Sequence, residues 1–179
     1  MQSVGNICLV TVDGMDFCIN EPKPFWPGWK SFKSNGPVFH YGVALCICTG
    51  DIVWNIGPCP CGQLVDLNIF QHDLMGELEA GEKVEADLGY QGEIFHMNED
   101  TIFFSESGQQ HTYLVRACHE AVNKRLKEWN CLNSLFWHNL RKHDPVFQAV
   151  ASIAQLAIEN GEPLFDVEYN DSVHFEELK

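Results

Sequence analysis

Residues 7–14 constrain the fold of this chain more than any other stretch, because they join a short apolar run to a single carboxylate. The run is rich in β-branched and aliphatic residues, which predicts a strand within residues 1–12 that is buried on both faces. Asp13 would then stand at the end of the strand. A buried carboxylate must be paired, hydrogen-bonded or bound to a metal ion. The alternative is a hairpin, because Asp13-Gly14 is also a strong turn signal and residues 16–19 have the character of a returning strand.

The charge of the chain limits the partners that it can bind unaided. It has 25 Asp and Glu against 11 Lys and Arg, a net charge of −14. A chain this acidic is not a self-sufficient nucleic-acid binder, because phosphate binding needs local positive charge. If the protein acts on DNA, a local basic strip or a separate DNA-binding protein must deliver the DNA. Bound metal ions would offset part of the negative charge.

Length and cysteine content place the chain in a broad class. Its 179 residues predict one domain over residues 1–161 and an acidic tail over 162–179. The eight cysteines include no CxxC pair, and Cys59-Pro60-Cys61 is too tight for the usual zinc spacing. We see neither a signal-peptide pattern nor an apolar run of membrane-spanning length, so we expect free thiols in a reducing compartment and no membrane contact.

Residues 20–37 are expected to form a long ordered loop, because four prolines interrupt them. Their four large aromatic residues either cover the core or stack on unpaired bases. These are Phe25, Trp26, Trp29 and Phe32. Beyond the loop, residues 38–48 and 52–56 predict a hairpin, and the Gly- and Pro-rich residues 57–62 predict a break in regular structure.

The rest of the chain predicts helices around one short strand. Asp66 begins an amphipathic helix that Gly81 ends. Lys83–Ala86 is expected to be a strand that delivers Asp87, as the first strand delivers Asp13. Residues 91–111 predict a loop with one short strand near 102–104.

Two further helices are predicted in the C-terminal part of the chain. Residues 115–129 carry an apolar stripe at helical spacing. The last helix is expected to start at Asp144, with Pro145 in its first turn, and to end at Asn160-Gly161.

Four acids in these elements predict a metal site. They are Asp13, Asp66, Asp87 and Glu120. The element order β-β-β-α-β-loop-α-α fits an α/β (α+β) protein of the RNase H-like fold, a mixed central sheet flanked by helices, in which the first and fourth strands are adjacent. Carboxylates gathered there would suit Mg²⁺ or Mn²⁺. Two such ions activate a water or hydroxyl for phosphodiester chemistry.

Each helical acid also has a simpler explanation. Asp66 sits where a helix-capping acid would stand. Glu120 shares a helix face with Arg116, Lys124 and Lys127, which is typical of a solvated surface stabilised by ion pairs. In a nuclease, the same basic residues, together with Arg125, become candidates for contact with the DNA backbone.

Four short motifs resemble the catalytic domain of the DDE superfamily endonucleases of the Harbinger/PIF type, which derive from transposases. In chain order the matching stretches are Val12-Asp13-Gly14 followed by Asp16-Phe17, Gly57-Pro58 followed by Gly62-Gln63-Leu64-Val65-Asp66, Glu85-Ala86-Asp87-Leu88-Gly89-Tyr90, and residues 116–127. They cover roughly residues 4–160. The resemblance implies an RNase H-like core, divalent metal ions, cleavage or transfer of DNA strands, and a nuclear location.

The resemblance also implies roles for the acids. Asp13, Asp66 and Glu120 would form the catalytic triad, with Asp87 as a fourth metal ligand. Whether Asp66 or Asp87 is the second triad acid stays open, because the fold favours Asp87 and the family pattern favours Asp66.

The chain departs from the family pattern near these acids. Met15 stands where the family usually has Thr, and Leu88 where it often has Gly or Ser. The DNA-binding segment of the family is not found in the sequence. The alternative function is therefore a catalytically inactive, host-adopted module that binds other molecules.

Overall fold

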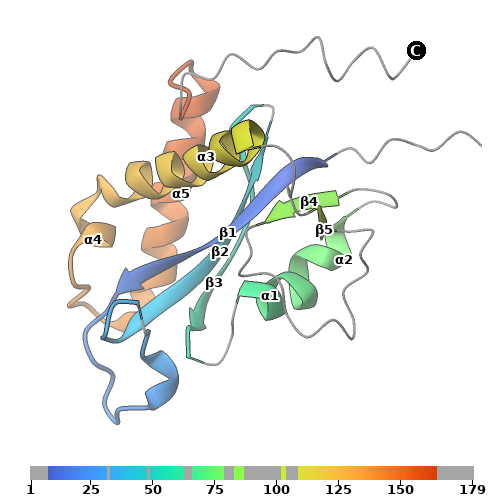
Figure 1. The fold of residues 1–179 in the computed structure, drawn as a ribbon. Helices are drawn as coiled ribbons and strands as arrows, with labels where there is room; N and C mark the ends of the chain where they lie inside the picture. Colours follow the sequence, from blue (N-terminus) through green and yellow to red (C-terminus); the bar gives the residue numbers. More distant parts are fainter. Residues whose placement is uncertain are drawn as a thin grey trace, which may run out of the picture.

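A mixed five-stranded sheet with helices on both faces forms the body of the protein (Figure 1). The computed structural model describes residues 8–31, 33–47, 49–62, 66–78, 83–86, 102–103 and 109–164. Within them, the predicted mixed α and β architecture is confirmed.

The longest strand, β1 (Cys8–Cys18), lies in the middle of the sheet. On one side it pairs antiparallel with β2 (Val38–Cys46), which pairs antiparallel with β3 (Ile52–Pro60). On the other side it pairs parallel with β4 (Lys83–Ala86), which pairs parallel with β5 (Ile102–Phe103). The strand order is therefore β3-β2-β1-β4-β5, and the first and fourth strands are adjacent as predicted.

β1 is longer than the sequence indicated. It continues through Asp13-Gly14 to Cys18, and its ladder with β2 is unbroken from Val10 to Cys18. The expectation that Asp13 ends the strand is wrong, and so is the hairpin alternative. Pairing with β2 along the whole length outweighs the local turn preference of Asp-Gly.

The hairpin of β2 and β3 is confirmed, but β3 extends further than predicted. Residues 57–60 were expected to break regular structure, yet Cys59 pairs with His40 and Pro60 with Phe39. A register shift between His40 and Gly42 accommodates the extension, as β-bulges do.

The predicted helices are present with different bounds. Residues 66–77 form one helical segment, made of α1 (Asp66–Ile69), the π-helical turn η2 (Phe70–Leu74) and α2 (Met75–Glu77). α3 (Gln109–Lys127) begins earlier than expected, and α5 (His143–Glu159) matches the last predicted helix. Between them lie α4 (Asn130–Asn133) and the 3₁₀ turn η4 (Leu140–Lys142). The loop at 20–37 contains one 3₁₀ turn, η1 (Pro27–Trp29).

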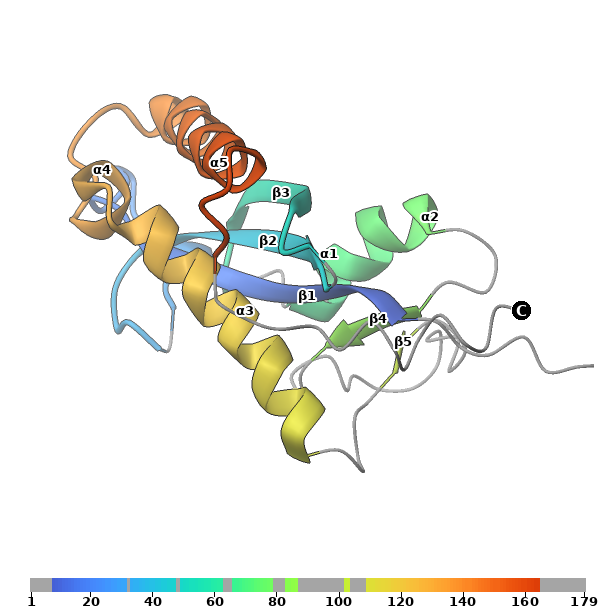
Figure 2. The same cartoon turned by 90° about the horizontal axis from the view of Figure 1, so that it is seen from above.

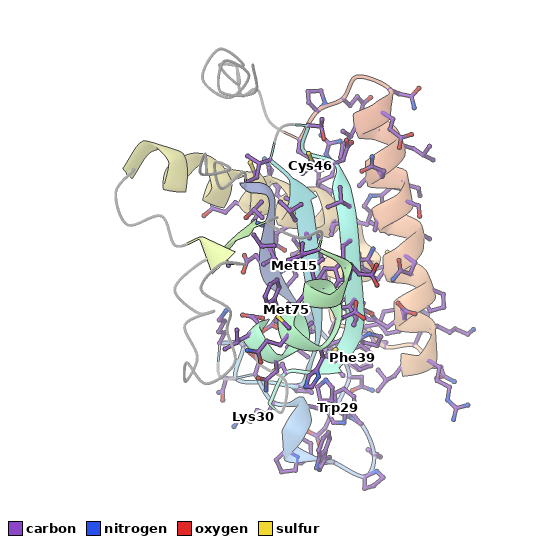
Figure 3. All side chains as sticks on the ribbon, turned by 90° about the vertical axis from the view of Figure 1, so that its right-hand side faces the viewer. Met15, Trp29, Lys30, Phe39, Cys46 and Met75 are labelled. Atoms are coloured by element: carbon purple, nitrogen blue, oxygen red, sulfur yellow. The ribbon has the colours of Figure 1, made fainter. Side chains whose placement is uncertain are left out.

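The two faces of the sheet carry separate cores. Met15 and Phe17 of β1 belong to a large core that α3 and α5 cover. Val12 belongs to a smaller core with Phe70 and Leu74 of the helical segment 66–77. Figure 2 shows α3 and α5 on the opposite side of the strands from α1 and α2. In Figure 3, the segment that carries Met75 lies in front of the sheet.

Candidate functional site

The side chain of Asp13 faces α3. Residues two apart on a strand share a face, and the neighbours of Asp13 on its face are Thr11 and Met15. Thr11 Oγ1 lies 3.0 Å from His119 Nε2 of α3, and Met15 belongs to the core beneath α3 and α5. Further along, Lys127 Nζ of α3 lies 5.4 Å from the centre of the Phe17 ring. α3 therefore follows β1, and Asp13 lies under its middle part.

Glu120 projects from the side of α3 that turns away from α5. Val122 and Leu126 are buried in the large core, and Arg125 reaches the backbone oxygen of Pro163, just beyond α5, at 3.3 Å. At 100° per residue, Glu120 shares its side of the helix with Asn123 and Lys127. Glu120 is exposed. α3, which carries Glu120, thus covers the face of the sheet that Asp13 is on. Glu120 itself lies roughly opposite the buried residues Cys118, Val122 and Leu126 on the helix and faces solvent.

The end of β4 lies beside β1 at this level. Ala86, the last residue of β4, pairs with Val12, the residue before Asp13. Asp87 follows directly in the sequence and lies outside the described residues, so the prediction that it joins Asp13 stays a prediction.

Asp66 lies on the opposite face of the sheet from Asp13. It begins α1, and a Cβ placed on Gly14 would overlap its Oδ1. Gly14 points away from the face of Asp13, because consecutive strand residues alternate. The predicted convergence of Asp66 with Asp13 is therefore not what the fold provides: the helix that carries Asp66 packs against the smaller core.

Asp66 instead takes part in a three-residue ionic cluster. His40 Nδ1 lies 2.7 Å from Asp16 Oδ1, and His40 Nε2 lies 2.5 Å from Asp66 Oδ1. Ser31 Oγ donates a hydrogen bond to Asp16 Oδ2 at 2.9 Å. His40 and Asp16 are opposite each other on β2 and β1, so the cluster links the sheet to the start of α1.

The electrostatics of this cluster favour a charged histidine. Burial by itself would lower the pKa of His40, but the carboxylates of Asp16 and Asp66 raise it to about 9. Burial would raise the pKa of Asp16, but the bonds from His40 and Ser31 hold it below its usual value. At neutral pH an imidazolium therefore bridges two carboxylates. Such an arrangement holds elements together and leaves His40 unable to act as a base.

The cysteines beside the cluster are poor nucleophiles. Burial raises the thiol pKa values of both Cys59 and Cys61. The six cysteines whose side chains the structure describes are free thiols: Cys18, Cys46, Cys59, Cys61, Cys118 and Cys131. Protonated, partly buried thiols do not favour a cysteine-based mechanism at this end of the sheet.

The described residues hold no group of three His, Cys, Asp or Glu side chains arranged to bind a metal ion. A site built on Asp13 and Glu120 therefore needs a further ligand from outside those residues. Carboxylates are the right donors for Mg²⁺ or Mn²⁺. Two buried polar atoms of α3, His119 Nδ1 and Asn123 Oδ1, also have no hydrogen-bond partner in the described part of the chain.

The basic residues predicted to contact DNA differ in their exposure and in their contacts. Lys124 is exposed, whereas Lys127 lies over Phe17. Arg125 is partly buried and lies 4.0 Å from Glu162. The side chain of Arg116 lies outside the described residues.

Sequence reasoning missed His40, Asp16 and Ser31. The sequence did hold a signal for the position of Asp16. Asp13 and Asp16 are an odd number of residues apart, so their side chains must face opposite sides of the sheet once the strand is known to continue through both.

The chain matches no family model, no curated protein and no solved structure. No helix in the described ranges is long and apolar enough to cross a membrane.

Proposed function

We propose that this protein is an RNase H-like, divalent-metal-dependent DNA endonuclease domain of the transposase-derived DDE type. The support for the fold is the strand order β3-β2-β1-β4-β5, with β2 antiparallel and β4 parallel to the central β1. This order and these directions are those expected for the fold that the motifs imply.

The single observation that carries the proposal is that α3, the helix that bears Glu120, covers the face of the sheet on which Asp13 lies. In addition, β4 ends beside Val12. We assign the metal ligands as Asp13, Asp87 and Glu120. Asp66 supports the fold through His40, so Asp87 becomes the second triad acid.

Each of these residues has a defined task in the proposed reaction. The metal ions would supply an activated water or 3′-hydroxyl and would stabilise the leaving oxygen. Asp13 and Asp87 would hold the ions at neighbouring strands, and Glu120 would close the site from α3. Lys124 and Lys127 follow Glu120 on α3, so they would neutralise phosphates next to the scissile bond.

The second candidate is an inactive module that keeps the fold. It is favoured by the position of Asp66: in the family pattern this residue is a catalytic acid, but here His40 holds it on the other face. Under this candidate a separate DNA-binding partner and a nuclear location would persist without cleavage.

Thermal unfolding with Mn²⁺ and Mg²⁺ tests the proposal. A ligand that binds only the folded state stabilises by about 2.7 kcal/mol at one hundred times its dissociation constant. We expect the metal-dependent rise in melting temperature to disappear in Asp13→Asn and Asp87→Asn, and to weaken in Glu120→Gln. A DNA-nicking assay on the same variants would follow.

Asp66→Asn is the matched control. It should lower the starting melting temperature yet keep the full metal-dependent rise. A rise that Asp66→Asn removes and Asp87→Asn keeps would reverse the assignment of the second acid. No rise in the wild-type protein would favour the inactive module.

A further inference from the structure

The positive charge of this acidic protein is concentrated at one end of the molecule. Residues 23–33 and 124–142 hold eight of the 11 Lys and Arg and one of the 25 Asp and Glu. We call these two segments the basic end. Every other part of the chain together is left with three basic and 24 acidic residues.

The two segments of the basic end lie side by side, although about a hundred residues separate them. Asn20 N donates to Phe136 O at 3.0 Å, and Phe136 N donates to Cys18 O at 3.0 Å. These bonds place the loop that follows β1 against the segment between α4 and η4. Figures 1 and 2 both show this loop next to the α4 region, at the end of the sheet where β1 finishes.

A chain of aromatic contacts fixes the two segments to each other. Trp26 packs on Trp29 with ring centres 5.8 Å apart, and Trp29 packs on Phe39 at 5.3 Å. From Phe39 the contacts continue through buried His143 to Phe136, at 5.1 and 4.8 Å. Figure 3 shows Trp29 and Phe39 close together at this end of the molecule. The surface groups of both segments are therefore held on a common rigid base.

Large aromatic side chains are exposed among the basic residues. Trp137 is 70% exposed, Phe25 47%, Trp129 43% and Trp26 39%. Lys23, Lys30, Lys33, Arg141 and Lys142 are exposed around them. Cations that follow a phosphate backbone, combined with planar rings that stack on bases, are the features by which proteins hold single strands without sequence preference.

We propose that the basic end is a binding site for unpaired single-stranded nucleic acid. A duplex keeps its bases stacked inside and offers these rings little to stack on, whereas an unpaired strand satisfies both the rings and the lysines. The acidic remainder of the surface repels a polyanion, so the basic end is where a polyanion would bind.

The site also has a route to the proposed metal ligands. Along α3, Glu120 lies about 10 Å from Lys127 at the basic end, at 1.5 Å per residue. A strand held at the basic end would pass Lys127 and Lys124 on its way to Asp13 and Glu120. This route rests on the proposed function, whereas the binding site itself does not.

Fluorescence anisotropy of a labelled 20-nucleotide oligothymidine tests the site, in EDTA so that metal plays no part. We expect binding that weakens steeply with salt and is at least tenfold tighter than binding of a duplex of equal length. Trp137→Ala combined with Trp26→Ala should weaken it about tenfold or more, because each stacked base is lost. Replacing Lys23, Lys30 and Lys33 by Gln should reduce the slope of log K against log salt by about 2.

Two controls separate the effects. Leu156→Ala removes a side chain that is 55% exposed near the far end of α5 and should leave binding unchanged. Arg in place of the same three lysines should retain the salt slope. Thermal unfolding of each variant checks that it is folded, and Trp137→Ala alone serves if the double variant is not.

Equal binding of oligothymidine and a labelled oligo-glutamate would overturn the proposal, because it would mean that the basic end binds acidic polymers in general, as an acidic protein partner would require. Unchanged binding in the tryptophan variants would overturn it as well. Because these assays contain no metal, they stand or fall independently of the metal titration.

Discussion

The two faces of the central sheet solve the burial of polar groups in opposite ways. The face under α3 and α5 is filled by aromatic and aliphatic side chains, and its buried histidines are neutral: burial lowers the pKa values of both His119 and His143 to about 4. The face under α1 contains Gly14 and the cluster around His40, whose pKa is raised to about 9. One face thus depends on close packing, and the other combines a smaller apolar core with charge pairing.

This difference separates the acidic residues with a structural role from the one that the proposed function uses. In the charged cluster, Asp16 and Asp66 pair with His40 and so hold α1 against the sheet. Asp13 stands on the packed face beneath α3, and it is the acid that the proposed function assigns to metal binding.

The largest expected effect comes from a cavity on the packed face. Phe147 is fully buried and stacks on Tyr41 with ring centres 4.0 Å apart. Phe147→Ala should lower the free energy of unfolding by about 4 kcal/mol, from lost burial and the cavity left behind. Urea unfolding at pH 6.5 and pH 9 measures it. A loss that differed strongly between the two pH values would blur the contrast between the faces.

The next effect isolates the charged face. His40→Gln removes the cation between Asp16 and Asp66, and we expect a loss on the order of 3 kcal/mol near neutral pH. The contribution of His40 is fully present below pH 6.5 and is lost as the pH rises through about 9, because its pKa is raised in the folded state. Wild-type stability should therefore fall between pH 6.5 and 9, and the variant should lack this fall.

The packed face provides a comparison, because its histidines make stability depend on pH in the opposite direction. The lowered pKa of His143 makes stability fall as the pH drops from 6.5 through about 4. His143→Phe should reduce the fall in stability at acidic pH, to which His119 also contributes, and should leave the fall at alkaline pH unchanged. If His40→Gln altered the fall at acidic pH instead, the assignment of charge to the two faces would be wrong.

The smallest effect tests how tightly the charged face is closed. A Cβ at Gly14 would lie 2.5 Å from His40 Cε1 and would overlap Asp66, so Gly14→Ala should cost about 1–3 kcal/mol as α1 is pushed away. Gly76 of α2 is the matched control, since no atom lies within 4 Å of its added Cβ. Gly76→Ala should be neutral or stabilise by up to about 1 kcal/mol. Equal effects in thermal unfolding would contradict close packing at Gly14.

Local patterns sufficed for much of this fold. The apolar stripe within residues 115–129 predicted α3, and the strand-like runs at 38–48 and 52–56 predicted the β2–β3 hairpin. The same logic failed at Asp13-Gly14 and at residues 57–60, where strong turn residues continue a strand. There, hydrogen bonds to β2 override local preference, and no window of neighbouring residues contains that partner.

The candidate site divides in the same way. The sequence alone determined which acids are present, their order along the elements, and the charge imbalance between 23–33, 124–142 and the rest. Only the tertiary structure decided that Asp13 and Asp66 face opposite sides, that His40 joins Asp16 to Asp66, and that the two basic segments meet. The physical reason is that strand parity, register and helix packing set the direction of each side chain, and these are fixed by partners distant in the sequence.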